Sequence, residues 1–326
     1  MKDWMKQLQD GEPRAIARAL SVVEAGGEQA EQLLARLKTI PQKAQAHVIG
    51  LTGAPGAGKS SLSDELIAYY RSAKHRVAVI AVDPSSPFSG GAVLGDRVRM
   101  MRHTLDEGVF IRSMGSRGSL GGLARPVRDA IKVLMVAGFE KIMLETVGVG
   151  QSELDVMYVA DTVVVVLTPA GGDQVQAAKA GVMETADLLI VNKADLPGAE
   201  RMKGELEEIT RATKNAKKTW DSGSFPEWDV PILLASALAH RGIEETASAL
   251  SAHFSFLMEQ DRLARRRGRG RLQELRERLE EQMIQKVKVM WVENDRLNAL
   301  KENVLRGEKS VQQALNDAQF LFSGIE

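Results

Sequence analysis

Residues 47–60 read HVIGLTGAPGAGKS, and this stretch decides the fold. It begins with a short aliphatic run, passes through spaced glycines and ends in Lys59-Ser60, where the helix-forming sequence SSLSDELIAYY starts. A segment of the form G-x-x-x-x-G-K-S between a strand and a helix is typical of a phosphate-binding loop. Its glycines let backbone N–H groups turn toward phosphate oxygens at a helix N-terminus, whose dipole also favours anions. The sequence therefore predicts a nucleotide-binding domain built around this loop.

The residues of this loop have distinct expected roles. Lys59 is expected to place its charge against the β and γ phosphates, in binding and in catalysis, while the Ser60 hydroxyl ligates Mg²⁺. The residues predicted to surround the phosphates are Gly53, Ala54, Pro55, Gly56, Ala57, Gly58, Lys59, Ser60 and Ser61.

Short runs rich in Val, Ile and Leu recur along the middle of the chain, with amphipathic helical sequences between them. Strands of this kind, buried on both faces, indicate an α/β fold with a mainly parallel sheet covered by helices on both sides. The predicted strands are 47–51, 76–82, 109–111, 141–144, 162–167, 188–191 and 231–235.

The two ends of the chain are predicted to be helical extensions of this domain. Apolar residues at helical spacing indicate two helices within residues 1–40, separated by Gly26-Gly27, the second ending at Pro41. We expect an N-terminal extension over 1–44, a nucleotide-binding domain over 45–255 and a C-terminal helical arm over 256–326.

The C-terminal arm carries an apolar stripe and an arginine run. The stripe, spaced every three or four residues, would bury one face of a long helix against the domain or against another chain. The arginine run fits either a solvated helix start or a surface for an anionic partner. The stripe consists of Leu272, Leu275, Leu279, Met283, Val287 and Met290, and the run of Arg262, Arg265, Arg266, Arg267, Arg269 and Arg271.

A second motif predicts which base the nucleotide carries. The tetrapeptide Asn192-Lys193-Ala194-Asp195 follows the predicted strand DLLIV. Guanine presents two adjacent N–H donors that the Asp195 carboxylate can accept, whereas adenine would place an acceptor there and leave the carboxylate unpaired. The Lys193 stem can lie on the purine face and Asn192 can brace the loop. After the next strand, Ser236-Ala237-Leu238 offers a backbone N–H for guanine O6, so we predict GTP and GDP as the ligands.

Acidic residues at strand ends predict the magnesium environment. Asp83 ends one predicted strand, Asp96 follows thirteen residues later, and Glu145 ends another strand and opens Glu145-Thr-Val-Gly148. Carboxylates beside phosphates suit Mg²⁺, so Asp83, Asp96 and Glu145 join Ser60 as expected ligands or supporting residues. The Gly148 N–H is expected to meet the γ-phosphate.

The residue that orients the catalytic water is less clearly marked. Ras-like proteins place a glutamine directly after the switch glycine, but here Val149 occupies that position and Gln151 lies two residues further on. Because an apolar side chain cannot orient water, we expect slow hydrolysis by the isolated protein, with Gln151 as the candidate and a partner completing the site.

The composition argues against several kinds of site, partner and location. The chain has no cysteine, which excludes disulfides and thiolate metal sites and fits a cytoplasmic location. Forty-three basic residues balance forty-three acidic ones, so no net charge argues for nucleic acid. The N-terminus does not resemble a signal or transit peptide, and no apolar run reaches the roughly 20 residues that span a bilayer.

Four motifs together identify a family resemblance. GAPGAGKS at 53–60, VDPSSPF at 82–88, ETVGVGQSE at 145–153 and the NKAD tetrapeptide resemble the MeaB/ArgK-type GTPases, G-protein chaperones of adenosylcobalamin-dependent acyl-CoA mutases. The resemblance runs from the N-terminal helices to the C-terminal arm.

The resemblance implies a SIMIBI-class G domain and a homodimer formed through the C-terminal arm. It also implies a function, in which GTP gates adenosylcobalamin loading onto a mutase such as methylmalonyl-CoA mutase and protects or rescues that enzyme. Residues 169–179, PAGGDQVQAAK, are similar to an additional switch of this family, with Asp173, Gln174 and Lys179 as candidates; from the residues alone they form a flexible turn before a helix.

Four other functions stay in competition. A metallochaperone is disfavoured because cysteine is absent and the five histidines are scattered. The guanine motif argues against an ATP-dependent kinase linked to amino-acid transport. A protein-targeting GTPase would use the basic run, but a Met-rich signal-binding domain is missing. A scaffold that binds GTP without hydrolysing it would lack phosphate release.

Overall fold

The computed structural model describes residues 2–41, 45–83, 100, 102–115, 125–146, 155–169, 185–220 and 228–321. They fall into two compact units, residues 1–270 and residues 271–326, which we treat separately. Within the described residues, no helix combines the length and the hydropathy needed to cross a bilayer.

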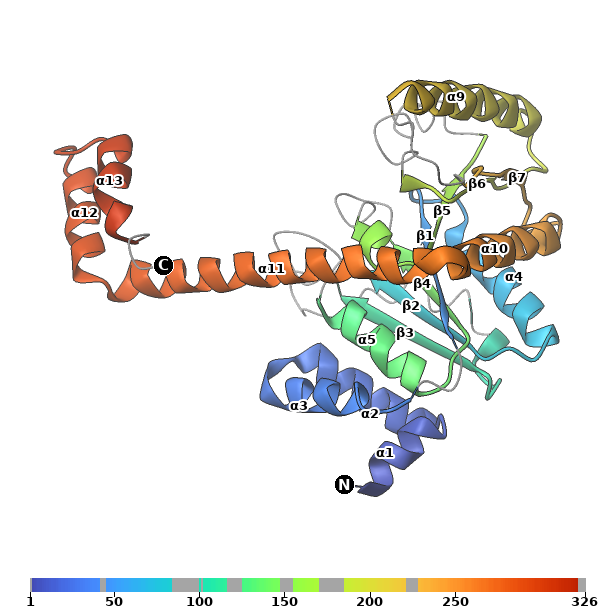
Figure 1. Ribbon diagram of the computed structural model, residues 1–326, viewed down its shortest axis with the longest axis horizontal. Coiled ribbons are helices and arrows are strands. Elements are labelled where there is room, and N and C mark those ends of the chain that lie inside the picture. Colours follow the sequence, from blue (N-terminus) through green and yellow to red (C-terminus); the bar gives the residue numbers. More distant parts are fainter. Residues whose placement is uncertain are drawn as a thin grey trace. The chain divides into compact units, whose positions relative to one another are not determined.

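The first unit is built on a sheet whose seven described strands all run parallel, in the order β3-β2-β4-β1-β5-β6-β7 (Figure 1). Each predicted strand is present, with ends that differ by a few residues. The predicted α/β fold is confirmed. The strands are β1 His47–Thr52, β2 Val77–Asp83, β3 Val109–Gly115, β4 Lys141–Thr146, β5 Thr162–Leu167, β6 Leu188–Val191 and β7 Ile232–Leu234.

Helices cover both faces of the sheet because alternate residues of the strands point to opposite sides. In β2, Ala78, Ile80 and Val82 pack with the N-terminal helices and α5 (Arg125–Val136). Val77 and Val79 face the other core, which contains residues of α4 (Lys59–Ser72) and α10 (Ile243–Met258). A third cluster joins β5 and β6 to α9 (Ala199–Trp220).

The N-terminal region differs from its prediction, since it contains three helices, α1 (Lys2–Gln9), α2 (Pro13–Ala25) and α3 (Gly27–Leu37). Gly11, with φ of 78°, and Pro13 at the first turn of α2 separate α1 from α2. The prediction missed this break because the apolar spacing begins only in α2. The helix that was expected to end at Pro41 ends at Leu37.

The α10–α11 junction is a short turn, η4 (Glu259–Asp261), and the long helix α11 (Arg262–Glu293) follows it. The second unit contains most of α11, then α12 (Asp295–Leu305), α13 (Val311–Asp317) and η5 (Ala318–Leu321). Asn294 caps α12 by accepting from the Leu297 N–H, and Ser310 with Gln313 forms a capping box on α13.

The predicted apolar stripe lies on α11 but is not buried within the chain. The exposed fractions of Leu272, Leu275 and Leu279 are 68%, 55% and 52%. Met283 and Val287 are also exposed, and Met290 is partly buried. Within the second unit the stripe therefore leaves apolar side chains exposed.

Candidate nucleotide-binding site

The phosphate-loop sequence connects β1 to α4 at the carboxyl edge of the parallel sheet, the edge where open α/β sheets bind ligands. Gly53, Gly56 and Gly58 have φ values of 139°, 76° and 89°, which residues other than glycine rarely adopt. A Cβ on Gly53 would lie 2.2 Å from the Val166 carbonyl oxygen, and one on Gly58 would lie 2.3 Å from Asn192 Nδ2. A Cβ on Gly56 would meet open space, so glycine there is required by its backbone angle alone.

Lys59 lies inside the loop, almost fully buried. Its Nζ donates to the carbonyl oxygens of Gly53 at 2.6 Å and Ala54 at 3.2 Å. The ammonium group is therefore held against two backbone carbonyl oxygens of the loop, where its charge would attract a phosphate.

Ser60 and Glu145 meet at the base of α4. The Ser60 hydroxyl donates to Glu145 Oε1, and the Ser63 hydroxyl lies 3.4 Å from Glu145 Oε2. Glu145 is buried at the end of β4, beside Leu51 of β1. A hydroxyl and a carboxylate next to a lysine form an oxygen donor set of the kind that Mg²⁺ prefers beside phosphates, so these residues fit the ion. Sequence analysis missed Ser63, although its i+3 spacing from Ser60 on a helix was the available signal.

Asn192 connects the base-recognition motif to the phosphate loop. Its Nδ2 donates to the carbonyl oxygens of Ala57 at 2.9 Å and Gly58 at 3.3 Å. Its Oδ1 is buried and has no hydrogen-bond partner among the residues that the structure describes. The side chain therefore braces the loop, as the sequence suggested it could, and it keeps one acceptor free beside the site.

Asp195 is solvent-exposed and is fixed by the neighbouring loop. The Ser236 hydroxyl donates to Asp195 Oδ1, and Ser236 Oγ accepts from the Ala239 N–H at 3.2 Å. The hydrogen bond from Ser236, then the nearby charges of Arg241 and Lys193, lower the pKa of Asp195. The carboxylate is therefore ionised at neutral pH and can accept two N–H donors.

In the Ser236-Ala237-Leu238 segment, which was expected to offer a backbone N–H to guanine O6, the N–H of Ser236 is already used within the chain. The Ser236 N–H donates to the Arg241 carbonyl oxygen at 2.9 Å in a short antiparallel bridge. A donor for guanine O6 must therefore come from Ala237 or Leu238, while Ser236 acts on Asp195 through its side chain. No sequence motif indicates this hydrogen bond, because the partner Arg241 lies in the following turn.

Contacts tie this loop to α4 as well. His240 Nδ1 lies 2.7 Å from Glu65 Oε2, and Glu65 also pairs with Arg102 at 2.7 Å. His240 and Arg102 lower the pKa of the Glu65 carboxyl by hydrogen bonding, against the opposing effect of burial. Glu65 is thus a connection between the base loop and the phosphate-loop helix that sequence analysis did not foresee.

Several predicted residues lie outside the described part of the chain. These are Asp96, Gly148, Gln151 and residues 170–179 of the additional switch segment. Asp83 ends β2 as predicted, where its backbone pairs with Gly115 of β3. Among the described residues, no group of three or more His, Cys, Asp or Glu side chains could hold a metal ion.

The arginine run is solvated only in part, because three of its six members are paired within the first unit. Arg266 forms a bidentate pair with Asp187, at 3.0 and 2.6 Å, and Arg267 a bidentate pair with Asp161, at 2.8 and 2.7 Å. Arg262 donates to the Phe256 carbonyl oxygen at 2.9 Å. Half of the run therefore fixes the start of α11 to the first unit.

Comparison with known proteins agrees with this geometry. The family described as "Methylmalonyl Co-A mutase-associated GTPase MeaB" matches residues 16–291. A putative GTPase of Pyrococcus horikoshii is 46% identical over 270 residues, which cover 83% of this chain and 82% of that protein. The GTPase ArgK of Escherichia coli is 34% identical over 282 residues, covering 86% and 84%.

Two further matches extend the comparison. The mouse protein named "Methylmalonic aciduria type A homolog, mitochondrial" is 35% identical over 228 residues, covering 65% of this chain and 55% of that protein. A solved structure described as a LAO/AO transport system kinase superposes with a TM-score of 0.72 and 25% identity, covering 99% of this chain and 97% of that one. The family match spans most of the sequence and contains both nucleotide motifs, so this chain is a P-loop GTPase of the MeaB family.

Proposed function

We propose that this GTPase hydrolyses GTP with Mg²⁺ as a chaperone that gates adenosylcobalamin loading onto an acyl-CoA mutase, methylmalonyl-CoA mutase being the first candidate, and protects or reactivates that enzyme. The GTP-binding part of this proposal rests on the hydrogen bond from Ser236 to Asp195, beside the phosphate loop to which Asn192 donates. The mutase part rests on the family description and on the mouse relative's name.

The residues of the site divide the work on the nucleotide. The loop glycines and Lys59 hold the phosphates, and Asp195 accepts the two guanine N–H groups. Ser60 and Glu145 would hold Mg²⁺, with Asp83 and Asp96 as further acidic residues; the ion would neutralise charge that develops between the β and γ phosphates. Glu145, being hydrogen-bonded through both oxygens, keeps a fixed orientation toward Ser60.

We propose slow hydrolysis by the protein alone. Val149 stands in the sequence where a water-orienting glutamine is expected, and Gln151, two residues further along the sequence, is the candidate for orienting water. Phosphate release measured with and without mutase tests both points. Turnover of tens per second without a partner contradicts the proposal, and absence of any phosphate release leaves only a GTP-binding scaffold.

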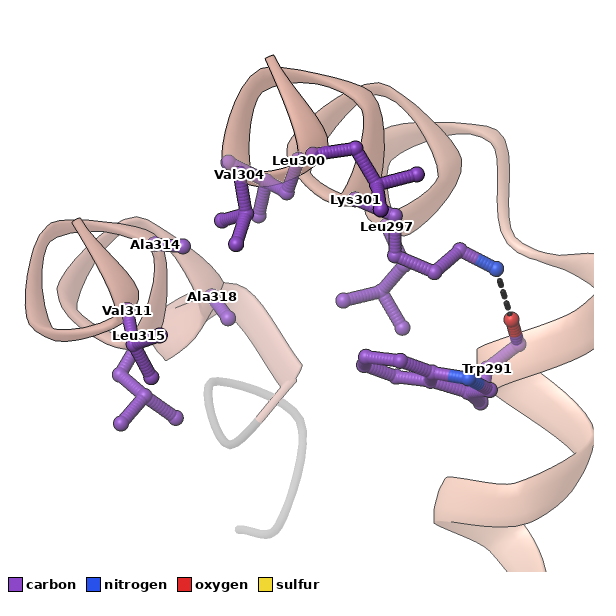
Figure 2. A pocket seen from close by; sticks show the side chains of 10 residues that line it. Trp291, Leu297, Leu300, Lys301, Val304, Val311, Ala314, Leu315 and Ala318 are labelled. Carbon is purple, nitrogen blue, oxygen red and sulfur yellow. Dashed lines mark hydrogen bonds between the residues drawn. The ribbon is translucent and has the colours of Figure 1, made fainter. Parts of the chain in front are cut away.

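We also propose that the second unit forms a homodimer by packing against a second copy. The polar side of α11 is internally paired, with Gln273–Glu277, Glu274–Arg278 and Arg276–Glu280 contacts, while the stripe residues stay exposed. Beside the end of α11 is an apolar pocket of about 450 Å³ (Figure 2). It is lined by Trp291, Leu297, Leu300, Lys301, Val304, Leu305, Val311, Ala314, Leu315 and Ala318.

The pocket is open on one side and almost entirely apolar. Lys301 donates from its Nζ to the Trp291 carbonyl oxygen and lies over the indole ring, 5.0 Å from the ring centroid (Figure 2). Leu305, Val311 and Leu315, which line this pocket, are also exposed. An exposed apolar area of this kind marks an interaction surface. Sedimentation of L279E/M283E should shift from dimer to monomer, and an unchanged mass contradicts the dimer.

The partner itself is tested by capture. Tagged protein loaded with a non-hydrolysable GTP analogue should retain a cobalamin-dependent acyl-CoA mutase from a cytoplasmic extract, and D195N loaded in the same way should not. A cytoplasmic setting fits the cysteine-free chain. The kinase description of the similar solved structure belongs to that protein; here, competition between GTP and ATP decides, since Asp195 predicts that ATP does not compete.

A further inference from the structure

The start of α11 is fixed to the first unit by an unusual turn. Gln260 and Asp261, neither of them glycine, both adopt left-handed backbone angles, with φ of 51° and 57°. Arg262 holds this turn by donating to the Phe256 carbonyl oxygen at 2.9 Å and to Gln260 Oε1 at 2.7 Å, with its guanidinium over the Phe256 ring. Strain of this kind persists only where surrounding contacts determine the conformation. The backbone conformation at the start of α11 is therefore determined by contacts within the first unit.

The next two turns of α11 grip one short segment of chain, residues 158–161. Arg266 Nε donates to the Ala160 carbonyl oxygen at 3.2 Å, and Arg267 holds both oxygens of Asp161. A Cβ on Gly270 would lie 2.2 Å from the Tyr158 carbonyl oxygen, so the helix backbone touches this segment directly. Three positions on one face of α11 therefore engage almost every residue of the segment.

Residues 158–161 are connected to two predicted nucleotide-binding segments of the first unit, the phosphate loop and the ETVGVGQSE motif. The segment begins in the short helix η2 (Val156–Tyr158), which follows the ETVGVGQSE motif by three residues in sequence. Val156 and Ala160 also pack against β1 so closely that a Cβ on Gly50 would lie 2.4 and 2.9 Å from them. β1 leads into the phosphate loop at Gly53. The segment is thus joined to the phosphate loop through β1 and to the γ-phosphate motif through the chain itself.

We propose that residues 158–161, gripped by Arg266, Arg267 and Gly270, form a coupling joint that links the nucleotide state to the C-terminal arm. Bidentate pairs and a direct backbone contact leave little independent movement between the segment and the helix. A shift of η2 that accompanies GTP or GDP binding must then move or strain the base of α11. If the nucleotide state changes the affinity of the arm for a partner by some factor, binding of that partner must change the ratio of GTP affinity to GDP affinity by the same factor.

The experiment compares the full-length protein with Gly270→Ala, loaded with GDP or with a non-hydrolysable GTP analogue. Amide hydrogen exchange over residues 262–275 should differ between the nucleotides by roughly 5-fold or more in the native protein, the lower end of typical allosteric coupling. The added methyl group pushes α11 off the Tyr158 carbonyl, so the difference should largely disappear in G270A. The affinity ratio for GTP analogue over GDP should shift by a similar factor.

Two control variants separate coupling from general damage. Gly204→Ala places a methyl in open space on α9, and Arg269→Ala removes an exposed neighbour on α11. Both should keep the nucleotide-dependent exchange and the affinity ratio of the native protein. If G270A does not fold by circular dichroism, Arg266→Lys replaces it, since lysine keeps the charge but loses the bidentate pair and the bond to Ala160.

The outcomes are distinct. Nucleotide-independent exchange over 262–275 in the native protein overturns the joint, as does unchanged coupling in a folded G270A or R266K. Failure of the native protein to bind GTP at all refutes the proposed function instead. A loss of stability without any change in the nucleotide-dependent difference assigns Gly270 and Arg266 a purely structural role and also overturns the joint.

Discussion

Ser236 donates its hydroxyl hydrogen to the carboxylate of Asp195, a residue 41 positions earlier in the chain on the adjacent loop. The bond fixes one carboxylate oxygen and its direction. We therefore expect Asp195 to meet the base in a single orientation, so that selectivity for guanine would depend on two loops together.

Asp195→Asn tests whether the Asp195 carboxylate recognises guanine. An amide in place of the carboxylate puts an N–H₂ group against guanine's own donors, so GTP affinity should fall by roughly 100-fold or more. Xanthine presents a carbonyl oxygen where guanine has its amine, so XTP affinity should rise. Titration with fluorescent nucleotides measures both, and a variant that still prefers GTP contradicts the assignment of Asp195.

Ser236→Ala tests the support given to Asp195. Losing a hydrogen bond to a charged group should cost about 1.5–3 kcal/mol, roughly a 10- to 100-fold loss of GTP affinity. Binding of inorganic phosphate or pyrophosphate, which touches only the phosphate loop, should stay unchanged. A parallel loss of both would place Ser236 in the general stability of the loop.

Gly58→Ala tests the close contact between the phosphate loop and Asn192. A Cβ at a φ of 89° and 2.3 Å from Asn192 Nδ2 cannot be accommodated without moving the loop, so nucleotide binding should be lost. Gly204→Ala is the matched control, because it adds the same methyl to an open helix position. Calorimetric titration with GDP distinguishes the two; binding by G58A within about threefold of the native value would contradict the geometry.

Glu145→Gln tests the magnesium environment. The amide keeps the shape of the side chain and can still contact Ser60, so folding and GDP binding should persist. Losing the negative charge should weaken Mg²⁺ and lower GTP turnover by roughly 100-fold, since such an ion contributes several kcal/mol at the transition state. Turnover measured across a range of Mg²⁺ concentrations should show a raised requirement; an unchanged requirement would remove Glu145 from the metal site.

A buried chain of polar groups predicts acid sensitivity. His47 Nε2 and His253 Nδ1 both contact the Thr162 hydroxyl, at 2.7 and 2.8 Å. Burial lowers the pKa of His47 well below its usual value and, despite the nearby Asp187 carboxylate, lowers that of His253 to about 4. The His253 imidazole is therefore largely neutral in the folded protein at pH 5, while that of the unfolded chain is protonated, and the lowered pKa of His47 acts in the same direction.

Stability should consequently fall as the pH drops below about 6.5, because only the unfolded state takes up these protons. His253 alone should account for about 2 kcal/mol between pH 7 and pH 5. Urea unfolding at these pH values measures the loss. His253→Asn should show a shallower pH dependence than the native protein, and identical slopes would show that the buried imidazole does not contribute.

The sheet and the two nucleotide motifs followed from sequence because their signals are local. Runs such as TVVVVL at 162–167 and the glycine spacing at 53–58 are contained within a few consecutive residues. The roles of Arg266 and Arg267 could not be predicted in this way, since their partners Asp187 and Asp161 lie 79 and 106 residues away. A run of arginines has the same appearance whether it is solvated or paired.

The N-terminal helices and the base loop show the same limit. The break between α1 and α2 depends on Gly11 and Pro13, which interrupt a segment whose apolar periodicity is too short to read. The Ser236 N–H is occupied because the chain turns back at Arg241. Turn geometry of this kind is decided by contacts that close only in the folded protein.

The residues that hold the root of α11 contact Ala46, Asp161 and Asp187, each directly before a strand, whereas the phosphate loop and the guanine residues follow the strands. We therefore expect the nucleotide to enter and leave at the opposite rim of the sheet from the attachment of this helix. GDP would then be exchanged for GTP while Arg266 and Arg267 keep their contacts. Any nucleotide-dependent change would reach the helix as a shift of its attachment and not as its detachment.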